Sequence, residues 1–188
     1  VLRATFAWLA ENKPEVGDAL RLQALLGLRI GEVWSARRRD VRRSKHKTPT
    51  GIVDRVALDV RGKTGARRVP CSPAAVAHLD HLLEINPGGP NDHVIGEVAG
   101  STSDALSSRI NNQFDLVPWE EIGPRWRPND RRALASNELI RTGISPPDYE
   151  AIMGHSYATA RQHYLDARPD DMYRAVGRMD VGGHLDVN

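Results

Sequence analysis

The stretch IMGHSYATARQHYL, residues 152–165, places a tyrosine in a polar segment of a chain that is only 5% aromatic. A Gly-His pair ending at His155 closes a helix-like stretch, and Tyr164 follows nine residues later. A core tyrosine would have apolar neighbours, whereas Arg161 and His163 flank this one. The pattern therefore favours a tyrosine that reaches out of the protein, and other segments must indicate toward what.

Length and composition are those of a single globular domain. The 188 residues are 40% hydrophobic and 27% charged, which suits one buried core and differs from disordered or fibrous chains. The one cysteine, Cys71, excludes a disulfide scaffold and favours a reducing cytoplasm. No apolar run approaches the roughly 18 residues of a membrane span, and we find no signal peptide. No methionine precedes Val1, so we expect a piece of a longer protein.

A basic run, SARRRDVRRSKHK at residues 35–47, stands out in a chain whose net charge is only +2. Such a run forms either a solvated face or loop, or a set of phosphate contacts, and taken alone it does not decide between them. If DNA binds here, the contacting residues are Arg37, Arg38, Arg39, Arg42, Arg43, Lys45 and Lys47.

Most of the chain has the periodicity of helices, with one β-hairpin among them. The segment 51–71 alternates apolar and polar residues, turns at Gly62–Gly65 and returns, which is typical of a hairpin. Apolar spacing and terminal Ser, Pro and Gly residues predict helices over 2–11, 15–26, 30–36, 73–85, 103–114, 129–142, 145–154, 157–166 and 170–178. We therefore predict one domain over 1–188, mainly α with a small antiparallel β-sheet (α+β), ending in a C-terminal helix and tail over 167–188.

Three segments place charged side chains at the ends of these elements. Arg29 comes directly after a helix ends, and Glu32 lies one turn further on, where it can fix the guanidinium group. Arg131 and Arg132 lie in the first turn of a helix, where free N–H groups attract anions. Lys63 lies at the hairpin tip. Each has an ordinary alternative, namely a local ion pair, surface arginines and a solubilising lysine.

Taken in order, four motifs resemble the tyrosine recombinase (phage integrase) family of site-specific recombinases. They are GLRIGE at 27–32, GKTGARRVP at 62–70, the P-x-D-x-R helix start at 128–132 and MGHSYATARQHYL at 153–165. The resemblance extends over about residues 15–166, and four motifs in this order are far more specific than any one of them. The resemblance implies the C-terminal catalytic domain of such an enzyme, with its N-terminal DNA-binding domain outside this sequence.

The resemblance also implies a role for each candidate residue. Tyr164 is the nucleophile, Arg29 and Arg132 clamp the phosphate, His155 is a third donor, Lys63 is the general acid and Glu32 supports Arg29. Tyr164 would displace the 5′-oxygen and form a 3′-phosphotyrosyl bond, which conserves the energy of the broken link without ATP, metal or another cofactor. The implied partner is double-stranded DNA at a specific recombination site, where the chain self-associates as a tetramer, with no membrane involved.

One position departs from the family pattern. The family commonly has a histidine three residues before the second arginine, and this sequence has Asn129. An asparagine amide hydrogen-bonds a phosphate oxygen but cannot take up a proton near neutral pH. Two alternatives stay open beside a recombinase: a type IB topoisomerase activity, and a DNA-binding module derived from an integrase that no longer cleaves.

Several other polar and aromatic residues are expected to be structural. The spacing of His78 and His81 is compatible with a metal, yet we expect no zinc there. Cys71 is expected to be a small buried residue. The four tryptophans are expected to pack rather than stack on bases: Trp8, Trp34, Trp119 and Trp126.

Overall fold

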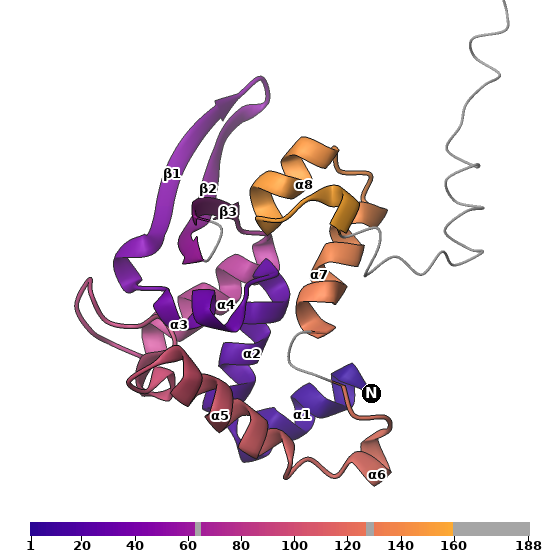
Figure 1. Cartoon of the computed structure of the whole chain (residues 1–188). Helices are drawn as coiled ribbons and strands as arrows, with labels where there is room; N and C mark the ends of the chain where they lie inside the picture. The colour runs from indigo at the N-terminus through magenta and orange to yellow at the C-terminus, as the bar shows by residue number, and fades with distance from the viewer. Residues whose placement is uncertain (63–64, 127–129, 160–188) are drawn as a thin grey trace, which may run out of the picture.

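The chain forms a helical body with a small antiparallel sheet along one side (Figure 1). The computed structural model describes residues 1–62, 65–126 and 130–159. Its elements are α1 (Leu2–Asn12), α2 (Pro14–Leu26), α3 (Ile30–Ser35), η1 (Arg38–Asp40), β1 (Val41–Thr48), β2 (Gly51–Gly62), β3 (Gly65–Pro70), α4 (Pro73–Ile85), η2 (Gly96–Ala99), α5 (Ser103–Phe114), α6 (Trp119–Ile122), α7 (Asp130–Arg141) and α8 (Pro146–Met153). This architecture confirms the predicted mainly α fold with a small antiparallel sheet.

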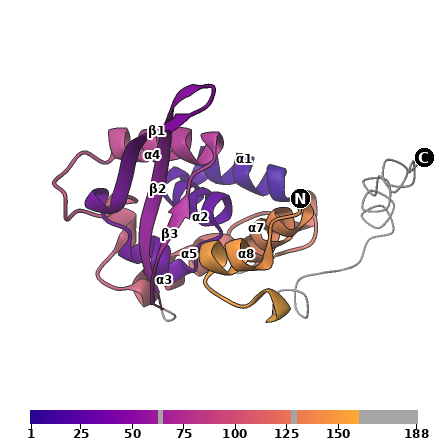
Figure 2. The ribbon, with the colours of Figure 1, turned by 90° about the horizontal axis from the view of Figure 1, so that it is seen from above.

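Helix α2 is the centre of the fold (Figure 2). It begins with Pro14, whose missing N–H costs nothing at the first helical position. Leu20, Leu22 and Leu26 are buried on it, and α1, α4, α5 and α7 all pack against it. The helix ends at Gly27 with φ 62°, a left-handed conformation that glycine adopts without steric strain. The end of the central helix therefore places Arg29 two residues after Gly27, beside the core.

The sheet has the order β1-β2-β3, and both neighbouring pairs are antiparallel. β2 pairs with β3 as far as Gly62 and Gly65, which confirms the predicted turn. Leu58, Val60 and Val69 are buried and belong to the main core. Helix α3 packs against β2, and α8 packs against β3. The sheet therefore contacts both α3, which follows Arg29, and α8, which precedes His155.

Strand β1 occupies the basic run, where the sequence suggested a solvated face or a loop. It pairs with β2 from Val41 opposite Leu58 to Thr48 opposite Gly51. All residues of β1 between these ends are exposed, and the β1–β2 ribbon extends beyond β3 (Figure 1). A strand with neither face buried needs no apolar alternation, so its sequence carries no period-two signal. The prediction of one hairpin was therefore incomplete.

Three short elements, η1, η2 and α6, were also not predicted, because three or four residues are too few to carry a helical period. The predicted helix over 170–178 and most of the one over 157–166 lie outside the described residues. Within the described ranges, no helix is both long and apolar enough to cross a bilayer.

The tryptophans pack as expected. The rings of Trp119 and Trp126 meet edge-on at 6.3 Å, and the Trp126 ring lies 4.7 Å from Phe114. Trp126 Nε1 donates a hydrogen bond to Thr5 Oγ1 at 3.1 Å. Trp8 and Trp34 are partly buried against the main core. The aromatic cluster therefore fastens the segment before α7 to α1 and α5.

Candidate active site

The ends of α2 and α8 meet at the candidate site, where Arg132 and Arg29 bind their carbonyl groups. Arg132 donates to the carbonyl oxygens of Gly27, after α2, and Met153, at the end of α8. Arg29 Nη2 donates to the carbonyl of Gly154 at 3.2 Å. The last carbonyls of a helix lack intrahelical partners and carry partial negative charge, so they hold cations in place.

Gly27 and Gly154 make this convergence possible. Both adopt a left-handed conformation, with φ 62° and 66°, which side chains rarely tolerate. A Cβ at Gly27 would lie 2.8 Å from Met153 Sδ, and one at Gly154 would lie 3.1 Å from Arg67 Cδ. A larger residue would therefore be strained at either position and would crowd the side chain of Met153 or of Arg67.

Glu32 is the buried carboxylate around which the arginines gather. Its Oε2 accepts a hydrogen bond from the backbone N–H of Arg29 at 2.7 Å, and its Oε1 lies 3.0 Å from Arg29 Nη1. Arg29 is the residue before α3 and Glu32 the third residue of that helix, the spacing at which an acidic side chain reaches back to the cap. The local ion pair considered from sequence is therefore present, but only as part of a larger cluster.

Arg67, on β3, is the residue that sequence analysis missed. Its Nη2 lies 2.9 Å from Glu32 Oε2, its Nη1 bonds Oε1, and its Nε donates to the Ile152 carbonyl at 2.7 Å. Arg132 Nη1 lies 3.8 Å from the same carboxylate. Gly62 leaves room for this group, since a Cβ there would collide with Glu32 Oε1.

The described side chains of the cluster include more guanidinium groups than carboxylates. Arg29, Arg67 and Arg132 share the single carboxylate of Glu32. Burial alone would raise the pKa of Glu32, but hydrogen bonds from Arg67 and the Arg29 backbone, with the charges of Arg67 and Arg132, lower it overall. Glu32 is therefore ionised at neutral pH, and its one negative charge faces three guanidinium groups among the described side chains. An anion bound at the surface of the cluster would find preorganised cations.

His155 extends the cluster toward α7 and α8. Its Nδ1 lies 2.8 Å from Arg132 Nη2, and its Nε2 lies 2.9 Å from the hydroxyl of Tyr149. Burial and the neighbouring charges of Arg132, Arg29 and Arg67 lower the pKa of His155, against a weak backbone contact to Met153. His155 is therefore neutral at pH 7.

Four of the predicted site residues thus come together: Arg29, Glu32, Arg132 and His155. Lys63, Asn129 and Tyr164 lie outside the described residues, and so does the side chain of Arg131, in the first turn of α7. No sequence signal distinguished Arg67 from the adjacent Arg68, because only the fold places one of them beside Glu32.

The basic run divides into two groups. Arg38 donates to the Leu83 carbonyl at 3.0 Å and is half-buried, which makes it structural. The guanidinium of Arg37 lies 5.5 Å from the centre of the Trp34 ring. The exposed members are Arg39, which bonds Asn91, Arg42, which bonds Asp59, Arg43, which bonds Asp80, and the β1 lysines Lys45 and Lys47.

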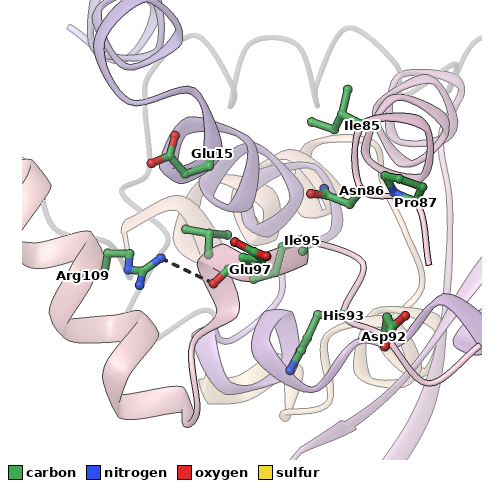
Figure 3. A pocket seen from close by; sticks show the side chains of 11 residues that line it. Glu15, Ile85, Asn86, Pro87, Asp92, His93, Ile95, Glu97 and Arg109 are labelled. Atoms are coloured by element: carbon green, nitrogen blue, oxygen red, sulfur yellow. Dashed lines mark hydrogen bonds between the residues drawn. The ribbon is translucent and has the colours of Figure 1, made fainter. Parts of the chain in front are cut away.

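A pocket of about 790 Å³ lies elsewhere, between the start of α2, the end of α4, η2 and α5 (Figure 3). Glu15, Asp92 and Glu97 line it together with Arg109, and its acidic lining does not suit DNA.

One of the two histidines considered for a metal has a partner within the protein: His78 Nε2 lies 2.9 Å from the Asp18 carbonyl. In the described part of the chain, no three His, Cys, Asp or Glu side chains are grouped as metal ligands.

Several solved structures share this fold. The integrase of transposon Tn1549 in complex with transposon right end DNA matches with a TM-score of 0.63 at 18% identity, over 94% of this chain and 63% of that chain. XerA recombinase matches with a TM-score of 0.62 at 17% identity, over 92% and 59%. A lambda integrase dimer bound to a core site matches with a TM-score of 0.57 at 17% identity, over 89% and 58%.

The likeness to these proteins is one of structure at low sequence identity. No protein-family model and no curated protein matches this sequence. The chain spans a little under two thirds of the length of these integrases and recombinases. At identities of 14–18%, the likeness concerns the fold. The chain has the fold of the catalytic domain of tyrosine recombinases.

Proposed function

We propose that this chain is the catalytic part of a site-specific DNA recombinase or integrase, which cleaves and rejoins DNA through a 3′-phosphotyrosyl intermediate. The observation that carries the proposal is the convergence of Arg29 and Arg132 on Glu32, at 3.0 and 3.8 Å, from segments far apart in sequence. A shared fold alone would not carry it, because one fold hosts many functions.

The proposed role of the arginine cluster is to bind the two nonbridging oxygens of a phosphodiester. Negative charge grows on these oxygens during phosphoryl transfer, and cations fixed in advance stabilise it without reorganising. The Arg29 side chain is 32% exposed and the Arg132 side chain 8%. Arg29 is therefore the more accessible of the two arginines to a phosphate, and Arg132 contributes positive charge from a more buried position.

The remaining steps are assigned by resemblance to residues outside the described ranges. The Tyr164 hydroxyl loses its proton to water and its oxygen attacks phosphorus, the bond to the 5′-oxygen breaks, and Lys63 protonates that oxygen. Asn129 hydrogen-bonds a nonbridging oxygen. Attack by a 5′-hydroxyl then restores the phosphodiester and releases Tyr164. The partner is double-stranded DNA at a specific site, on which four copies of the chain assemble.

A nicked suicide duplex that carries the native crossover site tests this proposal. Cleavage next to the nick releases a short strand that diffuses away, so the covalent intermediate accumulates as an SDS-resistant adduct. We expect an adduct from the unaltered chain. A chain that binds the duplex without forming an adduct, together with an Asn129→His variant that forms one, would instead support a DNA-binding module. Plasmid relaxation without recombination would support the topoisomerase alternative.

A further inference from the structure

A buried phenol connects the two helices behind the arginine cluster. Tyr149, on α8, is 0% exposed and forms a small core with Met153 and neighbouring aliphatic residues. Its hydroxyl lies 2.6 Å from Ser136 Oγ on α7 and 2.9 Å from His155 Nε2. Packing alone does not require a hydroxyl group at this place. A buried hydroxyl does require partners, and these two atoms supply them.

The donor and acceptor roles along this chain of hydrogen bonds follow from Arg132. A guanidinium group can only donate, so the 2.8 Å contact between Arg132 Nη2 and His155 Nδ1 makes Nδ1 the acceptor. Nδ1 also lies 3.4 Å from the Met153 carbonyl, where it could only donate, but this contact is much the longer of the two. A neutral ring then carries its proton on Nε2, which donates to the Tyr149 oxygen. The Tyr149 hydroxyl in turn donates to Ser136 Oγ. The chain therefore has one consistent direction, from Arg132 to Ser136.

The groups around His155 favour its neutral form. Protonation of Nδ1 would turn an N–H toward the guanidinium donor of Arg132, and the charges of Arg29 and Arg67 also oppose a second positive charge. The aromatic ring of Tyr149 meets the imidazole edge-on, with the ring centres 5.5 Å apart. These contacts therefore fix the orientation of the His155 imidazole and disfavour its protonation.

We infer that Tyr149 is a positioning residue, which holds His155 as the neutral Nε2–H tautomer so that Nδ1 orients the guanidinium group of Arg132. His155 would then act on the phosphate through Arg132, whereas the resemblance implies a direct third donor. The consequence for cleavage rests on the proposed function. The hydrogen-bond chain is a property of the free protein and can be tested without DNA.

The first arm of the test is NMR of the DNA-free protein with ¹⁵N-labelled histidine. We expect His155 to show a protonated Nε2 and an unprotonated Nδ1 at pH 7, with an Nε2–H proton protected from exchange with water. Tyr149→Phe should abolish that protection. Tyr157→Phe is the matched control, because its ring packs on Tyr149 at 5.4 Å but lies outside the Arg132–Ser136 chain. An Nδ1–H tautomer, a charged ring, or a protected Nε2–H in Tyr149→Phe would overturn the inference.

The second arm separates positioning from packing. Tyr149→Phe removes the partner of both the Ser136 hydroxyl and the His155 Nε2–H, whereas the double variant Tyr149→Phe/Ser136→Ala also removes the Ser136 hydroxyl and should recover part of the lost Tm. We expect adduct formation to stay at least about tenfold slower in the double variant, since Arg132 is still misaligned. Full recovery of the rate with the Tm would overturn the positioning role. If the unaltered chain forms no adduct, the proposed function fails, and the tautomer measurement still decides the inference.

Discussion

Arg67 and Glu32 form a two-pronged ion pair that ties the β2–β3 hairpin to the start of α3. Arg67 Nη2 lies 2.9 Å from Glu32 Oε2, and the second guanidinium nitrogen bonds Oε1. The two side chains are only 9% and 1% exposed. Arg67 lies opposite Val60 within the β2–β3 ladder, so this pair connects that hairpin to Arg29, which shares the same carboxylate.

The first prediction concerns the stability that this pair contributes. Arg67→Met keeps much of the side-chain volume but leaves a buried carboxylate with one partner fewer. We expect the free energy of unfolding to fall by about 3 kcal/mol, the lower range for a broken buried pair, since Arg29 and Arg132 remain. Urea unfolding at neutral pH measures it.

Arg68→Met is the matched control on the same strand. Arg68 bonds Asp59 at 2.6 Å, but its side chain is 63% exposed, so water screens the pair and its loss should cost much less stability than the loss of Arg67. Equal losses from Arg67→Met and Arg68→Met would contradict the assignment of Arg67 to the cluster.

The second prediction concerns acid. The pKa of Glu32 is lower in the folded chain than its ordinary value of 4.5, so its ionised form stabilises the fold above about that pH. This contribution disappears as the pH falls through the lower folded pKa. The stability difference between the unaltered chain and Glu32→Gln should therefore shrink toward low pH.

Asp59 also titrates in acid, since its hydrogen bond from Arg68 lowers its pKa to about 2, although burial acts in the opposite direction. Both chains in the Glu32 comparison should therefore carry Asp59→Asn. A stability difference that stays constant between neutral and acidic pH would rule out an ionised Glu32 as the source.

The third prediction separates cleavage from binding. Arg29→Ala should slow adduct formation by about a hundredfold, the scale of one lost oxyanion donor. Affinity for the duplex should change much less, because other basic side chains contact the backbone. Gel shifts and adduct rates on one duplex measure both. If affinity and rate fall by the same factor, Arg29 is only a docking residue.

The fourth prediction tests Lys63 as the general acid. Lys63→Ala should be slow on an ordinary duplex, because the departing 5′-oxygen then lacks a proton. A duplex with sulfur at the bridging 5′ position has a leaving group that needs no proton, and the variant should regain its rate there. Continued slow cleavage of the sulfur duplex would reassign Lys63 to phosphate binding.

The helices could largely be predicted from the sequence, because each buries an apolar stripe and has a marked end. Ser72 and Pro73 start α4 where predicted, and the Ser72 hydroxyl accepts from the Ala75 N–H. Gly27 and Gly154 end α2 and α8 where predicted. β1 could not be found this way, because its exposed faces leave no apolar pattern.

The candidate site was only half predictable, for a related reason. Arg29 and Glu32 are local in sequence, and their spacing suggested the contact that the structure has. Arg67 contacts Glu32 across 35 residues of sequence, and Tyr149 contacts Ser136 on a different helix. A buried tyrosine on an amphipathic helix has the pattern of an ordinary core residue. Only the packing of α8 against α7 and β3 reveals its hydroxyl partners.

The identity of the tyrosine that becomes linked to DNA tests the central claim most directly. The covalent adduct from the suicide duplex is digested with nuclease and protease, and peptide fragmentation by mass spectrometry locates the remaining nucleotide. The account predicts the nucleotide on Tyr164, and no adduct from Tyr164→Phe at unchanged affinity for the duplex. A nucleotide on Tyr157 or Tyr173, or an adduct that persists in Tyr164→Phe, would contradict it.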